Sequence, residues 1–318
     1  MSLAFVFPGQ GSQSVGMMAP FETLPSVRRT FDEAGAAIGI DLWTLVSNGP
    51  EQELSQTVNT QPAMLTAGVA LFRAWRELSG PDPVLLAGHS LGEYTALVVA
   101  GVLELAEAVP LIRFRAQAMQ EAVPEGQGAM AAILSLDDDA VRSVCQEASS
   151  AGVAEAANFN FPGQVVIAGQ VAGVQRAMEL ARARGAKRAV LLPMSVPSHC
   201  SLMRPAAERL RERLAGMNFL SPALPVVNNV DVAIEDSPER IRDALVRQLC
   251  NPVRWVESVT AIAGRGVQQI VECGPGGVLA GLNRRITPAV KAPDFRTIAL
   301  TDARELQELA RQSDAGLL

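Results

Sequence analysis

The sequence predicts an α/β protein whose mostly parallel sheet is covered by helices on both faces. Short apolar runs bounded by glycine or proline alternate along the chain with stretches that carry apolar residues at helical spacing. The chain has 318 residues, of which 48% are hydrophobic and 19% charged, so it is long enough to bury a full core. The rhythm of the elements changes at the polar segment 124–128, which indicates a second, smaller unit.

The first elements belong to the larger unit. Leu3–Phe7 and Val84–Ala87 are short apolar runs and are predicted to be buried strands. Gly88 is expected to open a tight turn into a helix that ends near Gly101. The other helices predicted before residue 124 cover residues 31–46, 62–78 and 104–122.

Residues 125–195 are predicted to form a small unit inserted into the larger one. The expected elements follow the order β-α-β-β-α-β, which is the ferredoxin-like unit. They cover residues 128–134, 137–149, 155–160, 165–168, 171–184 and 187–192. The larger unit therefore consists of residues 1–124 and 196–318.

The α/β pattern returns after Pro197. Helices are predicted around residues 202–214, at 238–249, after Asn251-Pro252 and after Gly274–Gly277. Strands are predicted at residues 225–229, 267–272 and 296–300.

Composition excludes several classes of function. The formal net charge is −6, there are only one Tyr and three Trp, and no run of Lys or Arg occurs, so we expect no nucleic-acid partner. Only two of the 27 basic residues are lysines, which leaves anion binding to arginine. The four cysteines form no CxxC pair, so neither a zinc cluster nor a thioredoxin-like motif is expected.

The amino terminus and the apolar runs bear on the location of the protein. The first residues lack the charged region and apolar stretch of a signal peptide, and no segment approaches ~20 uninterrupted apolar residues. We expect a cytoplasmic protein with no membrane partner.

Gly88-His-Ser-Leu-Gly92 matches the G-x-S-x-G pattern of a nucleophile elbow. The motif follows an apolar strand and precedes a helix, which is the context that such an elbow requires. The flanking glycines allow a sharp turn, so the Ser90 hydroxyl is expected to project at a helix N-terminus that favours a developing oxyanion. Ser90 is therefore the candidate nucleophile.

A serine nucleophile needs a base, and the chain has only two histidines. His89 adjoins the serine in a sharp turn, so its side chain is expected to point elsewhere and to pack in the elbow. His199 remains as the candidate base. Its orienting partner stays open: three aspartates lie in the right half of the chain, and a backbone carbonyl would serve equally well. The aspartates are Asp231, Asp236 and Asp243.

Two further segments carry polar groups. The glycine-rich loop Phe7–Gln13 fails the G-x-G-x-x-G pattern at Ser14 and has no following Lys-Ser or Lys-Thr, so it is predicted to present backbone N–H groups and not to bind a nucleotide. Arg113 and Arg115 lie two residues apart on a predicted helix and therefore on different faces. A guanidinium buried near Ser90 would demand a carboxylate partner.

Seven motifs in collinear order give the chain a resemblance to a known family. They are Phe7–Gln13, Thr60–Ala63, Gly88–Tyr94, Gly128–Ala131, Asn158–Asn160, Pro197–Cys200 and Asn251–Val253. Together they resemble the malonyl-CoA:acyl carrier protein transacylases of type II fatty acid synthesis. The resemblance implies an α/β-hydrolase-like core with an inserted ferredoxin-like subdomain.

The resemblance also implies residue roles. Ser90 would be the acylated nucleophile and His199 its base, oriented by the main-chain carbonyl of Gln248. The backbone N–H groups of Gln10 and Leu91 would form the oxyanion hole. Arg115 would hold the free malonyl carboxylate. Two more residues, Asn160 and Ser198, would line the cleft.

Ser198 departs from the Pro-Phe-His sequence that many relatives carry before the base. The position lies near the substituent side of the substrate in related domains, so the smaller residue bears on the width of the acyl pocket. Unbranched malonyl remains the expected acyl group, with methylmalonyl as the alternative.

The activity implied is a ping-pong transfer of malonyl from malonyl-CoA, through an ester on Ser90, to the phosphopantetheine thiol of acyl carrier protein. No metal or other cofactor is expected, and a monomer is expected. Three alternatives stay open. They are a serine thioesterase or hydrolase, a carrier-binding subunit without activity, and the malonyl transferase of a malonate decarboxylase acting on another carrier.

Overall fold

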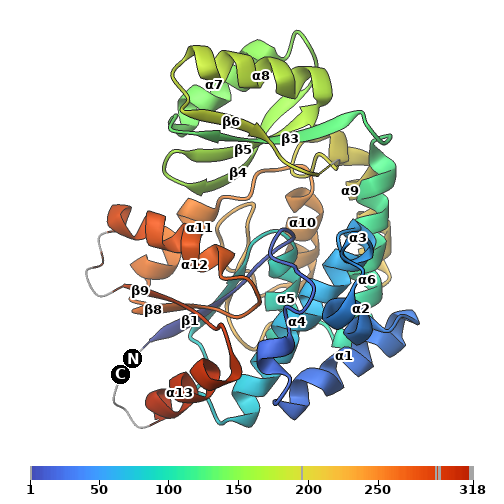
Figure 1. Ribbon diagram of the computed structural model, residues 1–318, viewed down its shortest axis with the longest axis vertical. Coiled ribbons are helices and arrows are strands. Elements are labelled where there is room, and N and C mark those ends of the chain that lie inside the picture. Colours follow the sequence, from blue (N-terminus) through green and yellow to red (C-terminus); the bar gives the residue numbers. More distant parts are fainter. Residues whose placement is uncertain (1, 195, 291, 293–294, 315–318) are drawn as a thin grey trace.

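The computed structural model describes residues 2–194, 196–290, 292 and 295–314, and its strands form two sheets (Figure 1). The strands are β1 (Leu3–Phe7), β2 (Leu85–Gly88), β3 (Gly128–Leu134), β4 (Ala154–Phe161), β5 (Gln164–Gln170), β6 (Arg188–Leu191), β7 (Val226–Val227), β8 (Gln269–Glu272) and β9 (Arg296–Ala299). The first sheet has the order β7-β2-β1-β8-β9 and is parallel throughout, whereas the second has the order β4-β5-β3-β6 and is antiparallel. The predicted α/β class, with a parallel core sheet and a separate antiparallel unit, is confirmed.

Helices pack against both sheets. They are α1 (Pro25–Ile38), α2 (Leu42–Asn48), α3 (Glu51–Leu54), α4 (Thr57–Glu77), α5 (Leu91–Val99), α6 (Leu105–Ala122), α7 (Asp138–Ala148), α8 (Val171–Ala183), α9 (Arg204–Ala215), α10 (Pro238–Gln248), α11 (Trp255–Gly264), α12 (Val278–Ile286) and α13 (Ala303–Asp314). Short 3-10 turns occur at Ala19–Phe21, Ser201–Met203 and Thr287–Ala289. Among the described residues, no helix combines the length and the apolarity that are needed to cross a membrane.

The parallel sheet is buried on both faces, as its continuous apolar strands predict. In β1, Phe5 and Phe7 contribute to one apolar cluster, whereas Ala4 and Val6 contribute to another on the opposite face. Each of these four side chains is fully buried. The strand ends that carry the candidate site are therefore held rigidly.

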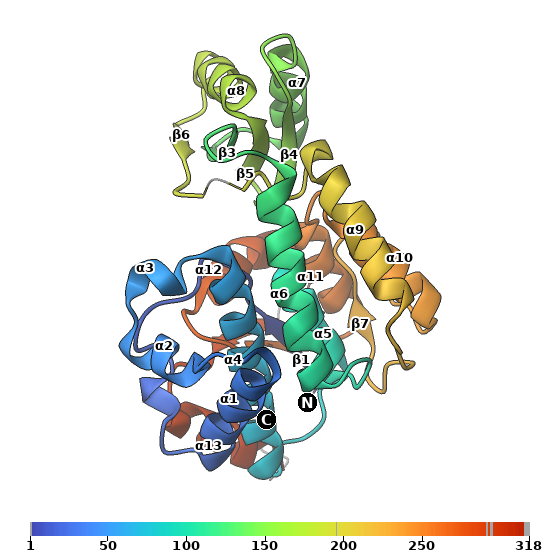
Figure 2. The same cartoon turned by 90° about the vertical axis from the view of Figure 1, so that its right-hand side faces the viewer.

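The smaller unit lies at one end of the molecule (Figures 1 and 2). Its four strands all fall between residues 128 and 191, inside the predicted range 125–195. Helices α7 and α8 cover one face of its sheet. On the other face, Met130 and Ala132 pack against Cys200 of the larger unit.

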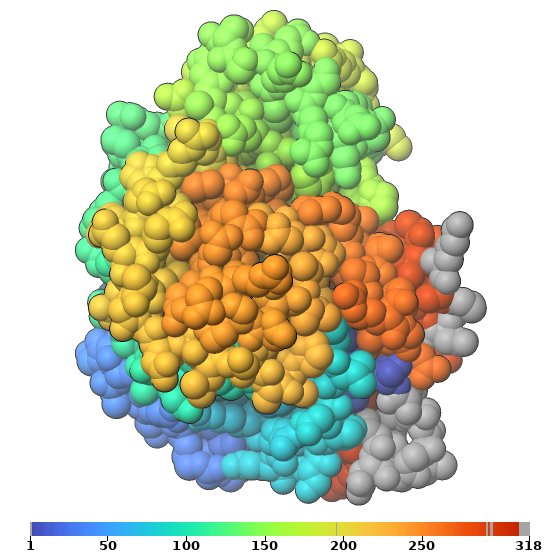
Figure 3. Space-filling model, turned by 180° about the vertical axis from the view of Figure 1, so that it is seen from behind, coloured from blue at the N-terminus to red at the C-terminus, as the bar shows by residue number. Residues whose placement is uncertain are grey.

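Hydrogen bonds join the smaller unit to the loops of the candidate site. The edge strand β4 pairs with the chain at Val253, whose N–H donates to the Ala157 carbonyl at 2.9 Å and whose carbonyl accepts from Phe159 N–H at 2.9 Å. The Glu155 carboxylate accepts hydrogen bonds from both N–H and hydroxyl of Ser201, at 2.8 and 2.6 Å. Seen from behind, α9, α10 and α11 (yellow to orange) form a continuous surface below the green smaller unit (Figure 3).

Some predicted elements differ from the structure. The helix predicted at 31–46 is wrong: two helices replace it, because Gly39 adopts φ +68° and ends α1. The helix predicted from residue 62 begins at Thr57 and contains Pro62. The strand predicted at 225–229 is only two residues long, and the side chain of Asn229 bonds within the candidate site instead.

Candidate active site

Ser90 lies at the sharp turn between β2 and α5, with φ +53° and ψ −108°. This backbone conformation is costly for a residue other than glycine and is found mainly at functional sites. The flanking glycines allow it: a Cβ on Gly88 would lie 1.8 Å from the Gly92 carbonyl carbon, and one on Gly92 would lie 2.0 Å from the Phe7 carbonyl oxygen. The G-x-S-x-G pattern is thus explained by close backbone contacts.

The structure brings Ser90 and His199 together although 109 residues separate them. Ser90 Oγ lies 2.7 Å from His199 Nε2, and His199 Nδ1 lies 2.8 Å from the main-chain oxygen of Gln248. His199 also has a positive φ of +63°, and its N–H donates to the Leu249 carbonyl at 3.0 Å. The C-terminal end of α10 therefore fixes both the backbone and the ring of the histidine.

These contacts define the protonation of the His199 ring. Burial, followed by the nearby positive charge of Arg115, lowers the pKa of His199 to about 3, so the ring is neutral at physiological pH. The Gln248 carbonyl accepts hydrogen bonds only, so Nδ1 carries the proton. Nε2 is then free to accept the Ser90 proton, which is the state that a general base needs.

The partner of His199 is thus the backbone carbonyl, one of the two possibilities that the sequence left open. Asp231 instead binds Arg247 through two hydrogen bonds of 2.7 and 2.8 Å, and Asp243 contacts the same guanidinium at 2.5 Å.

Arg115 is buried beside the Ser–His pair, with only 1% of its surface exposed. Nη2 donates to Ser90 Oγ at 3.3 Å and to the side-chain oxygen of Gln248 at 3.1 Å, whereas Nη1 donates to the side-chain oxygen of Gln61 at 2.9 Å. The guanidinium also lies over the Tyr94 ring, 5.2 Å from its centroid. Burial lowers the pKa of Arg115, and the neighbouring groups oppose this shift.

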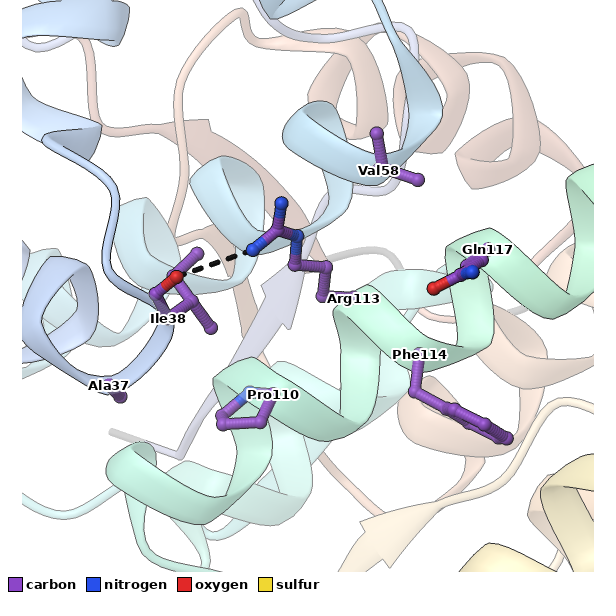
Figure 4. Close-up of a pocket in the computed structure, with 7 residues that line it drawn as sticks. All are labelled: Ala37, Ile38, Val58, Pro110, Arg113, Phe114 and Gln117. Atoms are coloured by element: carbon purple, nitrogen blue, oxygen red, sulfur yellow. Dashed lines mark hydrogen bonds between the residues drawn. The ribbon is translucent and has the colours of Figure 1, made fainter.

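Arg113 points to a different face of α6, as the two-residue spacing predicts. Its guanidinium donates to the Ile38 carbonyl at 3.3 Å in a surface hollow of about 390 Å³ (Figure 4). Residues of α1, α4 and α6 line this hollow, and neither Ser90 nor His199 is among them. This hollow is therefore separate from the candidate chemistry.

The two residues implied for the oxyanion hole lie on adjoining segments. The loop after β1 packs against the elbow, since His89 N–H donates to the Phe7 carbonyl at 3.0 Å and a Cβ on Gly9 would lie 2.6 Å from the His89 oxygen. Leu91 is the first residue of α5, where a backbone N–H has no acceptor within the helix. The side chain of Gln10 donates to Thr57 Oγ1 at 3.2 Å, which anchors the loop.

The other candidates from the sequence lie around the elbow. Asn160 Oδ1 accepts from His89 Nε2 at 3.0 Å, and the His89 ring packs near Trp255, so His89 is the packed elbow residue that the sequence predicts. Asn160 thus links the smaller unit to the elbow. The Ser198 hydroxyl is buried and points toward Met130 Sδ at 3.5 Å.

Sequence reasoning missed two residues behind the elbow, Asn229 and Glu93. Asn229 accepts from Ser90 N–H at 2.7 Å and donates to the Gly88 carbonyl at 2.6 Å, so its amide holds both ends of the turn. The buried Glu93 carboxylate accepts from Asn229 N–H at 2.9 Å and from the side-chain amide of Gln248 at 2.8 Å.

Burial raises the pKa of Glu93 to about 7 against the opposing effect of these hydrogen bonds. Glu93 lies in the Gly88–Tyr94 motif, which was a usable signal, but nothing local marks Asn229.

The fold and the comparison with known sequences identify the protein as an acyltransferase. The chain belongs to the acyl transferase domain family, whose sequence model matches residues 4–299. The resemblance carried by the seven motifs is confirmed.

The names of individual relatives describe a more specific activity than the family model does. The chain is 56% identical over 290 residues to the malonyl CoA-acyl carrier protein transacylase of Escherichia coli (strain K12), covering 91% of this chain and 94% of the relative. An acyl-carrier-protein S-malonyltransferase from Burkholderia pseudomallei 1710b has a similar structure, with a TM-score of 0.94, 55% identity, and coverage of 98% of this chain and 100% of the other.

A malonyl-transacylase solved in complex with its type II PKS acyl-carrier protein also has a TM-score of 0.94, at 50% identity. The match covers 98% of this chain and 100% of that one.

The elbow geometry predicts a position-specific effect of a single methyl group. Gly92→Ala should lower the free energy of unfolding by about 3 kcal/mol, because the added Cβ meets backbone that cannot move aside. It should also abolish labelling of Ser90 by a fluorophosphonate. Thermal unfolding and intact mass measure the two effects.

Gly264→Ala is the matched control. Its Cβ meets no atom within 4 Å, so it should leave labelling intact and stabilise α11 by up to about 1 kcal/mol. Equal behaviour of the two variants would contradict the account of the elbow.

Proposed function

We propose that this protein transfers a malonyl group from malonyl-CoA to the phosphopantetheine thiol of acyl carrier protein, through a malonyl ester on Ser90. The observation that carries the proposal is the buried Arg115 guanidinium, 3.3 Å from the hydroxyl that also contacts His199. Such a site suits an acyl group that carries a thioester at one end and a free carboxylate at the other. The names of the relatives support the same reaction.

The first half-reaction acylates the serine. Ser90 Oγ attacks the thioester carbonyl while His199 Nε2 takes its proton, and the tetrahedral oxyanion is stabilised by the N–H groups of Gln10 and Leu91. Collapse of this intermediate breaks the carbon–sulfur bond, and the imidazolium returns the proton to the sulfur of CoA. Arg115 binds the distal carboxylate throughout.

The second half-reaction repeats these steps with a new nucleophile. His199 takes the proton of the carrier's thiol, the sulfur attacks the malonyl ester, and the same proton passes to Ser90 Oγ as the ester bond breaks. The acyl group moves from thioester to oxygen ester to thioester without a change of oxidation state. The reaction therefore needs no cofactor beyond the two thioester carriers.

Arg115 also provides selectivity. A neutral acetyl group would leave the buried guanidinium without an anionic partner, which costs about 1–3 kcal/mol or more relative to malonyl. A cytoplasmic location, a monomeric state and a preference for unbranched malonyl remain predictions.

The acceptor is tested by following free CoA from malonyl-CoA with and without the phosphopantetheinylated carrier. We expect about one equivalent of CoA per enzyme without carrier and continuous release with it. Intact mass should show one malonyl group on the wild type and none on Ser90→Ala.

Rapid CoA release without carrier would make the protein a hydrolase. Absence of any adduct on the wild type would make it a non-catalytic carrier-binding subunit, and acylation without transfer to acyl carrier protein would favour a malonate decarboxylase subunit.

The depressed pKa of His199 predicts the pH dependence of acylation. A base whose pKa lies near 3 stays unprotonated as the pH falls through 6.5, so the first-turnover release of CoA should show no acidic limb above about pH 5. Stopped-flow measurement of CoA between pH 5 and 8 tests this. Because Glu93 has a pKa of about 7, Glu93→Gln is measured alongside; a limb centred near 6.5 in both proteins would show that the His199 ring is solvated when substrate binds.

A further inference from the structure

Arg115 is held by uncharged groups. The hydrogen-bond acceptors of its guanidinium among the described residues are neutral: the amide oxygens of Gln61 and Gln248 and the hydroxyl of Ser90. The Tyr94 hydroxyl, which also interacts with the guanidinium, is neutral as well. Its Nε lies buried without a hydrogen-bond partner within the part of the chain that the structure describes. The guanidinium is therefore fixed in position while its charge is not cancelled by direct contact with a carboxylate.

The orientations of the two amides follow from their other contacts. The Gln248 amide nitrogen donates to the Glu93 carboxylate at 2.8 Å and to the Ser90 carbonyl at 3.1 Å. The Ser90 carbonyl accepts only and the Arg115 guanidinium donates only, so the nitrogen must face Ser90 and the oxygen must face Arg115. The Gln61 amide nitrogen faces Met119 Sδ at 3.8 Å, a weak acceptor, and its oxygen likewise faces the guanidinium.

Glu93 is the nearby buried carboxyl group; with its pKa raised to about 7 it is ionised in part at neutral pH, and it acts through an intervening amide. It is 2% exposed and contacts Gln248, which in turn contacts Arg115. A buried cation needs some compensation, but a bidentate ion pair within the protein would compete with the substrate for the same N–H groups. An amide between the two charges gives compensation without that competition.

We propose that Gln61 and Gln248, the latter oriented by Glu93, are the positioning residues that make Arg115 selective for an acyl group with a free carboxylate. The amides hold the guanidinium in place, and the substrate provides the anion that pairs with it. This inference rests on the proposed function, because it concerns the same acyl site. Gln61 is the residue that tests it, since the main chain of Gln248 also orients His199.

Gln61→Glu changes one amide to a carboxylate of the same shape. It places a carboxylate beside Arg115 Nη1, so the positive charge of the guanidinium should be neutralised before the substrate binds. We expect kcat/KM for Ser90 acylation by malonyl-CoA to fall by about tenfold or more, with acylation by acetyl-CoA changed by less than about threefold. The readout is the ratio of malonyl to acetyl adducts on Ser90, by intact mass, after mixing with equimolar malonyl-CoA and acetyl-CoA.

Two further variants make the result specific. Gln61→Met keeps the side-chain length and adds no charge, so it should lower the malonyl-to-acetyl ratio by clearly less than Gln61→Glu does. It also keeps the proposal testable should Gln61→Glu fail to fold. Gln120→Glu adds the same charge at an exposed position of α6 and should leave the ratio unchanged.

The outcomes separate this inference from the proposed function. Absence of a malonyl adduct on the wild type would overturn the function itself. A malonylated wild type whose selectivity is unchanged in Gln61→Glu would overturn only the role of the amides. Equal loss of selectivity in Gln61→Glu and Gln61→Met would show that Gln61 merely fills space, and would also overturn it.

Discussion

The site depends on a guanidinium buried against a nucleophilic serine. A cation with 1% exposure is costly unless other groups stabilise it, and here two amide oxygens, an aromatic face and a carboxylate one amide away do so. Burial, and after it the charge of this cation, lowers the pKa of His199 and so keeps the ring neutral. The proposed selectivity for the acyl group therefore depends on one buried charge, which residues of α4, α5, α6 and α10 surround.

The fold shows why those helices converge. The parallel sheet is buried on both faces, and β1 and β2 end side by side, so the loop after β1 lies against the elbow after β2. The smaller unit is joined to the larger one at Val253, which follows α10 and its last residue Gln248, and at Ser201, two residues after His199. The inserted unit thus contacts the segments on either side of the His199 loop and the elbow.

Local pattern was enough to predict most of the fold. Leu3–Phe7 is a strand at the predicted bounds, and the β-α-β-β-α-β order of the inserted unit follows from apolar periodicity and glycine breaks. The break at Gly39 was missed because apolar spacing continues across it. In the site, Ser90 and His199 could be predicted because the sequence itself shows the G-x-S-x-G motif and contains only two histidines. Asn229 acts across the fold on Ser90, 139 residues away, which no local pattern encodes.

The central claim is that the charge of Arg115 selects the acyl group. The most direct measurement is the rate of Ser90 acylation by malonyl-CoA and by acetyl-CoA in Arg115→Ala, with Arg113→Ala as the control on the other face of α6. The account predicts that Arg115→Ala lowers the malonyl-to-acetyl rate ratio by at least about 30-fold, the equivalent of about 2 kcal/mol for a broken buried charge pair, whereas Arg113→Ala leaves it unchanged. An unchanged ratio in Arg115→Ala would contradict the account.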